Sequence, residues 1–178
     1  MTTGWGPGLS EEARLVEALR RGDQEAFEEL HGRYASLVHG ILLARVPRFE
    51  VEDLEQEVFL TVFRRIQTLR DAKALGGWVA MIARNRATDY HRRAPDTQEL
   101  PPDLRAKDSS EPEARAILDV IRSLPEAYRE PLVLRLVEGM TGPEIAARTG
   151  LTHGSVRVNL HRGMRQLREE LSRSQIHG

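Results

Sequence analysis

Two groups of charged side chains could each bind a partner of opposite charge. Residues 50–57 carry five acids and no base, whereas residues 153–168 carry four arginines and no acid. The formal net charge of the 178 residues is only −1, so the two signs are separated along the chain. This separation indicates two partners. Because phosphate contacts supply most of the affinity of a small DNA-binding protein, we expect this chain to bind duplex DNA weakly by itself.

The acidic group lies in a stretch with helical periodicity. Asp53, Gln56 and Glu57 fall on one arc of the predicted helix, opposite an apolar stripe. That stripe is flanked by Phe59 and Phe63 and consists of Val51, Leu54, Val58, Val62 and Ile66. Periodicity alone favours an ordinary amphipathic helix whose charges face water. The functional alternative is an acidic docking face for a basic partner helix.

The basic group belongs to a helix-turn-helix pattern. Thr141 and Glu144 form a capping box at its start. Ala146 supplies the small residue at the helix crossing, and Gly150 tolerates the positive φ of the turn. The outward face of the second helix then consists of His153, Ser155, Arg157, Val158, His161, Arg162 and Arg165. Arginine suits guanine edges and phosphates, so the pattern favours DNA reading over a merely solvated basic face.

A third cluster lies near the end of a helix predicted over residues 78–93. It consists of Arg84, Asn85, Arg86, Arg92 and Arg93, with Asp89 the only acid among them. Asparagine and arginine can reach base edges or phosphates, and Trp78 or Tyr90 could stack on a base. The structural alternatives are a core position for Trp78 and arginines that favour the helix dipole.

The elements that must position these clusters all have helical patterns, and aromatic residues make up only 5% of the chain. We therefore predict an all-α protein of two small helical domains joined by a flexible linker. Residues 1–9 are predicted to be disordered, 10–94 to form the first domain and 112–173 the second, which contains the helix-turn-helix. Residues 95–111 form the linker, because they are rich in proline and acidic residues and show no period. Within the domains, the helices are expected to begin near Ser10, Asp23, Glu50, Trp78, Glu113, Pro125, Thr141 and Thr152, with a loop over 69–77.

Several functional classes are disfavoured. The chain has no cysteine, its six histidines lack metal-ligand spacing, and it has neither a phosphate loop nor a nucleophile elbow. We therefore expect no enzyme activity, no cofactor and no metal. No apolar run is long enough to cross a bilayer and no signal pattern precedes residue 10, so we expect a cytoplasmic protein without membrane insertion.

In this order, the segments resemble bacterial RNA polymerase sigma factors of the extracytoplasmic function (ECF) group. Residues 53–59 are similar to the acidic core-binding motif of that family, and residues 77–85 to the stretch leading into its reader of the minus-ten element. Residues 124–126, 138–141, 144–146, 154–157 and 160–162 are similar to its C-terminal DNA-binding domain. The resemblance covers roughly residues 10–172.

The resemblance implies a factor that brings RNA polymerase core to specific promoters. Asp53, Gln56 and Glu57 would dock on the clamp of the largest polymerase subunit. The loop over 69–77 would capture a flipped minus-ten base together with Asn85, Arg86, Asp89, Arg92 and Arg93. The outward residues from His153 to Arg165 named above would read the minus-thirty-five element. An anti-sigma protein is a common partner in the family.

The sequence departs from the family pattern at two places. Val158 and Asn159 stand where Ser and Arg are frequent, and Leu69 stands where Phe is common. The main alternative function is a stand-alone transcriptional regulator with the same type of helix-turn-helix. Such a regulator should carry a dimerisation or sensing domain upstream, and the motif at 53–59 and the arginine-rich helix argue against it.

Overall fold

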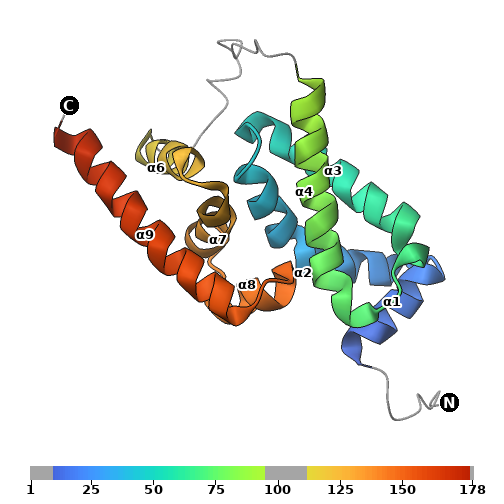
Figure 1. Cartoon of the computed structure of the whole chain (residues 1–178). Coiled ribbons are helices and arrows are strands. Elements are labelled where there is room, and N and C mark those ends of the chain that lie inside the picture. The colour runs from blue at the N-terminus through green and yellow to red at the C-terminus, as the bar shows by residue number, and fades with distance from the viewer. Residues whose placement is uncertain (1–9, 95–111, 177–178) are drawn as a thin grey trace.

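The computed structural model describes residues 10–94 and 112–176, which form helices and connecting turns with no strand among them (Figure 1). The predicted all-α class is confirmed. The predicted disordered N-terminus and linker lie outside the described residues. The first half contains α1 (Glu11–Arg20), α2 (Gln24–Leu43), α3 (Arg48–Arg65), the 3-10 turns η1 (Ile66–Thr68) and η2 (Ala72–Ala74), and α4 (Leu75–Arg93). The second half contains α6 (Pro112–Ser123), α7 (Glu126–Leu136), α8 (Gly142–Thr149) and α9 (His153–Ile176).

The first helices begin where short polar side chains can cap them. The Ser10 side chain accepts a hydrogen bond from the Ala13 amide at 3.2 Å, and Asp23 accepts from the Glu25 amide at 2.9 Å. Between α1 and α2, Gly22 has a φ of 74°, a conformation that suits glycine. The predicted breaks near Ser10 and Asp23 are therefore confirmed.

Helix α2 runs through the core of the first half, with Leu30, Leu37 and Ile41 fully buried. The apolar stripe predicted on α3 is buried against it, and so is the inward face of α4, which includes Val79 and Ala83. Removing these side chains from water is the main driving force for this packing. Phe63 differs from its neighbours on α3, because 48% of its surface is exposed.

Helix α7 has the corresponding central place in the second half, where it packs on α6, α8 and α9. Its residues Leu132, Val133 and Leu134 are fully buried. Gly163 allows α9 to approach α7 closely, since a Cβ atom there would lie 3.1 Å from the Tyr128 Cβ atom. The second half thus has apolar residues of its own at its centre.

Two predicted boundaries were wrong. Helix α4 begins at Leu75 rather than Trp78, so the loop expected over 69–77 is shorter and contains η2, whose Lys73 amide is capped by the Asp71 side chain at 3.0 Å. The helix expected to begin near Pro125 was predicted to end at Gly139, but α7 ends at Leu136. Its last turn is closed when the Met140 amide donates to the Leu134 carbonyl at 2.9 Å, with Gly139 at a φ of 69°.

The two halves pack directly on each other. Helix α2 contacts α7, and α4 contacts α8, so segments far apart in the sequence lie side by side (Figure 1). Gly40 lies at the first contact, where a Cβ atom would come within 2.6 Å of the Leu134 side chain. Gly76 lies at the second, where a Cβ atom would come within 3.0 Å of the Arg148 carbonyl oxygen. The sequence analysis did not predict these contacts.

Candidate polymerase and DNA interfaces

The three residues predicted for polymerase docking share one exposed face of α3. Asp53, Gln56 and Glu57 are all exposed, while their neighbours Leu54 and Val58 are buried. The amphipathic arrangement predicted for this segment is therefore confirmed. The Glu57 carboxylate also forms an ion pair with Arg86 of α4, which joins two predicted sites.

A groove between α2 and α3 adjoins this acidic face. Its lining includes Phe27, His31, Glu55 and Phe59, with the rings of His31 and Phe59 centred 4.5 Å apart. Burial raises the pKa of Glu55 above its ordinary value, an effect that the nearby histidines partly offset. An apolar floor beside acidic side chains suits an amphipathic helix with basic residues.

The residues predicted to contact the minus-ten element differ in their exposure to solvent and in their contacts with other side chains. Asn85 is exposed on α4, and Arg92 and Arg93 are exposed at its end. Arg86 is only 19% exposed because it contacts Glu57, and Asp89 lies 3.7 Å from Arg92. The structure therefore places all five on α4, with Asn85 the most accessible of those in its middle turns.

The turn before α4 is hydrogen-bonded to α1. Leu69 is buried, and its carbonyl oxygen accepts a hydrogen bond from the Arg20 guanidinium. Gln67 donates in return to the Arg20 carbonyl oxygen at 2.9 Å. Leu69 therefore contributes to the core, and the polar side chains that follow it, Arg70 and Asp71, are the exposed ones.

The helix-turn-helix is held by the local interactions that its sequence predicts. The Thr141 amide donates to Glu144 at 2.7 Å, and the Glu144 amide donates to the Thr141 hydroxyl at 3.3 Å, so both halves of the capping box are present. The hydrogen bond from the Thr141 amide lowers the pKa of Glu144. Gly150 has a φ of 76°, and the Ser155 amide donates to the Thr152 hydroxyl at 3.1 Å at the start of α9.

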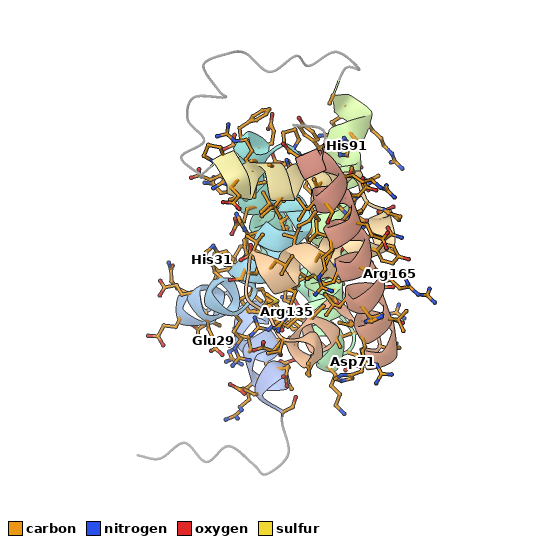
Figure 2. The ribbon with its side chains drawn as sticks, turned by 90° about the vertical axis from the view of Figure 1, so that its left-hand side faces the viewer. Glu29, His31, Asp71, His91, Arg135 and Arg165 are labelled. Atoms are coloured by element: carbon orange, nitrogen blue, oxygen red, sulfur yellow. The ribbon has the colours of Figure 1, made fainter. Side chains whose placement is uncertain are left out.

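The predicted DNA-reading face of α9 is solvent-exposed. The exposed residues include all those named for it, namely His153, Ser155, Arg157, Val158, His161, Arg162 and Arg165. Figure 2 shows Arg165 projecting outward from α9. Val156, between Ser155 and Arg157, is buried and packs against the core. The local geometry thus presents the N-terminal turns of α9 to a partner, as groove-reading helices require.

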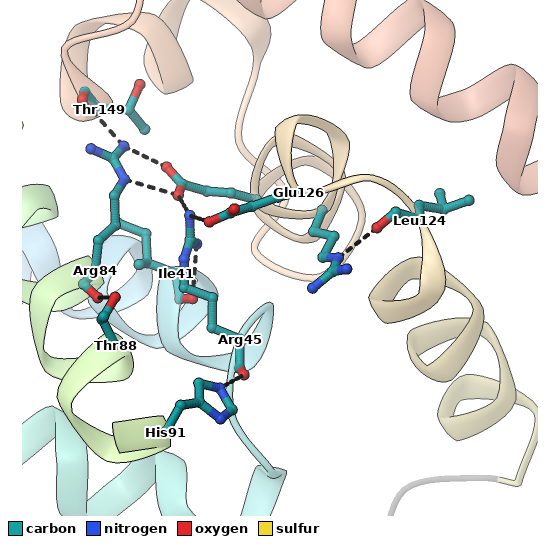
Figure 3. A network of polar contacts seen from close by, with 10 residues as sticks. Ile41, Arg45, Arg84, Thr88, His91, Leu124, Glu126 and Thr149 are labelled. Atoms are coloured by element: carbon teal, nitrogen blue, oxygen red, sulfur yellow. Dashed lines mark hydrogen bonds and ion pairs between the residues drawn. The ribbon is translucent and has the colours of Figure 1, made fainter. Parts of the chain in front are cut away.

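Arg84 does not belong to the DNA-facing set, although it precedes Asn85 directly. Its guanidinium crosses to α7 and binds both carboxylate oxygens of Glu130, at 3.0 and 2.6 Å, and also donates to the Thr149 carbonyl oxygen at 3.4 Å. Arg45, at the end of α2, binds the same carboxylate at 2.8 Å. Figure 3 shows Arg45 and Arg84 converging from the first half toward α7, with Thr149 beside them.

Glu130 is the buried acid of this cluster, with 5% of its side chain exposed. Burial alone would raise its pKa, but the hydrogen bond from Arg84 and the charge of Arg45 outweigh that effect and lower it. Glu130 is therefore ionised in the folded chain at neutral pH. An acid directly before the apolar run 131–134 was the signal in the sequence that could have revealed this contact.

Further polar contacts connect the halves around this cluster. Arg122 of α6 donates to the Leu43 carbonyl oxygen at 2.9 and 3.0 Å and to the Val46 carbonyl oxygen at 2.9 Å, at the end of α2. His39 of α2 contacts the Glu138 carboxylate. In each contact, a charged side chain of one half binds a polar group of the other half. The sequence analysis predicted none of these contacts.

Two helical halves with an exposed helix-turn-helix are typical of DNA-binding transcription factors. A family model described as Sigma-70 region 2 matches residues 30–95, and one described as Sigma-70, region 4 matches residues 114–167. The RNA polymerase sigma factor CarQ of Myxococcus xanthus is 35% identical over 170 residues, covering 90% of this chain and 98% of that protein. The ECF RNA polymerase sigma-E factor of Haemophilus influenzae is 31% identical over 176 residues, covering 88% of this chain and 93% of that protein. The chain therefore belongs to the ECF group of RNA polymerase sigma factors, which are non-catalytic factors of transcription initiation.

Solved structures share the fold at lower identity. A structure of CnrH in complex with the cytosolic domain of CnrY matches with a TM-score of 0.64 and 23% identity, covering 89% of this chain and 96% of that chain. The sigma factor RpoE of Bartonella quintana, solved in complex with the anti-sigma factor NepR, matches with a TM-score of 0.57 and 17% identity, covering 82% and 95%. Within the part of the chain that the structure describes, no helix is long and apolar enough to span a membrane.

Proposed function

We propose that this sigma factor recognises the minus-ten element with its first domain and the minus-thirty-five element with its second. The observation that carries the proposal is the exposed face of α9, where seven side chains suited to DNA follow directly after the capped α8 and the Gly150 turn. The boundary between the two domains is proposed to lie within residues 95–111.

The acidic face of α3 is the proposed docking site for the polymerase core. Asp53, Gln56 and Glu57 are exposed together beside the groove between α2 and α3. A basic helix of the polymerase clamp could place apolar side chains in that groove and cations against the carboxylates. Such charge complementarity speeds encounter and fixes the register of the two helices.

The proposed minus-ten surface is the exposed side of α4 around Asn85, extended by Arg92 and Arg93. A base flipped out of the stack costs a few kcal/mol to unpair and needs polar groups that bind its edge. Asn85 offers both a donor and an acceptor for this purpose. Arg86 can contribute once its ion pair with Glu57 is exchanged for a DNA phosphate, and Asp89 is proposed to position Arg92 through their contact.

The proposed minus-thirty-five surface is the exposed face of α9. Arg157, Val158 and Arg162 lie near its N-terminal end, which enters the major groove in helix-turn-helix proteins. Arg157 and Arg162 offer forked donors for guanine edges or phosphates, and Val158 an apolar contact for a thymine methyl group. His153, Ser155, His161 and Arg165 complete the contact surface.

The proposed partners are RNA polymerase core, promoter DNA and an anti-sigma protein. The last is proposed from family membership, and the sigma factor RpoE of Bartonella quintana was solved in complex with the anti-sigma factor NepR. A protein with these partners would act in the cytoplasm.

The test is run-off transcription with purified core polymerase and promoter DNA from upstream of this protein's own gene. We expect a specific transcript that requires the protein and disappears when either promoter element is scrambled. Transcription that ignores both elements would contradict the assignment of the two surfaces.

A further inference from the structure

Exposed apolar side chains gather beside two grooves of the molecule. The described residues expose six large apolar side chains, and four of these occur in two pairs, Leu60 with Phe63 on α3 and Leu136 with Val137 at the end of α7. Leu60 lines the groove between α2 and α3, and the Phe63 ring is centred 5.5 Å from that of Phe27, which lines the same groove. Leu136 lines a second groove, between α7 and α9. Apolar side chains concentrated on the surface in this way mark binding surfaces.

The two grooves carry opposite charges. The groove between α2 and α3 is lined by the carboxylates of Glu52 and Glu55 beside its aromatic rings. The groove between α7 and α9 combines half-buried apolar residues with exposed basic ones, namely Leu160, Met164, Arg135, His161, Arg165 and Arg168. Arg165 also lies 3.9 Å from Glu169, but water screens this exposed pair. Each groove can therefore attract the charges of the other and also bury its apolar side chains.

The two grooves of one chain do not face each other. Figure 1 shows α3 and α9 on opposite sides of the molecule, and α9 packs on α7, α7 on α2, and α2 on α3. A second copy of the chain can bring its basic groove to the acidic groove of the first without any change in fold. Such a contact joins two different surfaces, as in heterologous, head-to-tail assemblies.

We propose that the free sigma factor pairs head to tail, with α3 of one copy lying in the groove between α7 and α9 of a second copy. Leu60 and Phe63 of the first copy pack on Leu136 of the second, and Glu52 faces Arg168. This pairing covers the face of α3 proposed for polymerase docking, so a paired chain is withheld from the polymerase core. The withholding rests on the proposed function, whereas the pairing concerns only the free chain.

The size and charge of this contact determine how strong the pairing is. One helix in one groove is a smaller contact than a standard protein interface of roughly 1,600 Å², so we expect weak, reversible pairing that is observed at about 100 μM protein. At about 1 M salt the screening length falls to roughly 3 Å, so the pairing should weaken as the salt concentration rises. Because each copy uses a different surface toward each neighbour, the average mass should increase with protein concentration.

Two double variants each change one groove and leave the other intact. Glu52→Gln combined with Leu60→Gln removes a charge and an apolar side chain from the acidic groove. Leu136→Gln combined with Arg168→Gln does the same to the basic groove. All four residues are exposed, so the fold should not depend on them. Far-UV circular dichroism establishes that each variant keeps its helices.

Sedimentation velocity of the full chains measures the pairing. At about 100 μM protein and low salt, the native chain should have an average mass above that of the monomer, and each groove variant alone should remain monomeric. The matched control, Glu113→Gln combined with Met81→Gln, changes exposed residues that line neither groove and should associate like the native chain. A mixture of the two groove variants should form a one-to-one complex and nothing larger, because one intact groove remains on each. A monomeric native chain, a groove variant that associates normally, or a monomeric mixture would overturn the pairing.

Competition with the polymerase core tests the withholding. Asp53→Lys combined with Glu57→Lys gives a chain that should not bind the core but keeps its basic groove. This chain should reduce the apparent affinity of labelled native chain for the core about twofold when its free concentration equals the dissociation constant of pairing. Adding the two basic-groove substitutions to it should abolish that reduction. An unchanged affinity would overturn the withholding. A native chain that does not bind the core, with the expected sedimentation results, would refute the proposed docking and leave the pairing standing.

Discussion

Charged residues on α7 and α9 have opposite surroundings, although both helices belong to the second half. Glu130 of α7 is 5% exposed and is bound by two arginines of the first half. Arg157 and Arg162 of α9 are exposed to solvent. Position relative to the other half therefore separates a charge that holds the chain together from charges that are available to a partner.

The largest effect is expected on the exposed acidic face of α3. Asp53→Lys combined with Glu57→Lys should abolish binding of polymerase core, with a loss of about a hundredfold or more, because like charges would face the basic partner. Pull-down of purified core enzyme measures this loss. Glu28→Lys combined with Glu113→Lys changes the net charge equally at other exposed positions. Equal retention of core by both double variants would remove the docking assignment.

The exposed arginines of α9 should affect promoter choice and leave core binding intact. Arg157→Ala should reduce transcription from the native promoter by about tenfold to a hundredfold, since one bidentate base contact contributes about 1–3 kcal/mol of discrimination. Binding of core polymerase should stay near the native level. A parallel loss of transcription and core binding would indicate that Arg157 has a role in folding.

The stripes and caps could be predicted because they depend on local spacing. Val58 and Ala83 are buried where helical periodicity put them, and the Thr141 capping box is present. The predicted start of α4 was wrong because two adjacent glycines, Gly76 and Gly77, are typical of a loop. They are helical because the α8 backbone packs on them, and a Cβ atom on Gly76 would lie 3.0 Å from the Arg148 carbonyl oxygen.

The contact between the halves had no local signature of comparable strength. Gly40 in the middle of α2 and Glu130 in the middle of α7 are each unfavourable for an isolated buried helix. Each residue is explained by the half that it contacts. Gly40 of the first half faces Leu134 of the second, and Glu130 of the second half binds Arg45 and Arg84 of the first. No periodicity within either half encodes that partner, so the buried charge cluster became visible only in the folded chain.

A single cut within residues 95–111 tests whether the two halves are separate folding units. We expect limited proteolysis near Pro102 to leave two helical pieces, because each half buries its own apolar centre around α2 or α7. Circular dichroism of the separated pieces measures the helix that each retains. Cooperative loss of helix from both pieces would show that the contact between the halves is required for folding.

The smallest effect is expected at the rim of the interface, where His39 contacts Glu138. The hydrogen bond that the His39 ring donates to the Glu138 carboxylate raises the pKa of His39, against the opposing effect of burial, and Glu55 and Arg48 of α3 add smaller charge effects of opposite sign. A histidine whose pKa is raised in the folded state contributes stability fully below its ordinary pKa of about 6.5 and loses that contribution as pH rises through the raised value. The free energy of unfolding should therefore decrease across this range as pH increases.

His39→Gln should remove that part of the pH dependence. Because the His39 side chain is 40% exposed, water screens the pair and its contribution should stay below about 1 kcal/mol, or at most about 3 °C in Tm for a chain of this length. Thermal melts of the native chain at pH values below 6.5 and above the raised pKa measure the difference, and His153→Gln on the exposed face of α9 is the matched control. If the native chain and His39→Gln lose stability equally with rising pH, groups other than the His39–Glu138 pair govern the response. The contact of this pair across the two halves would then contribute no more to stability than the exposed His153 of α9 does.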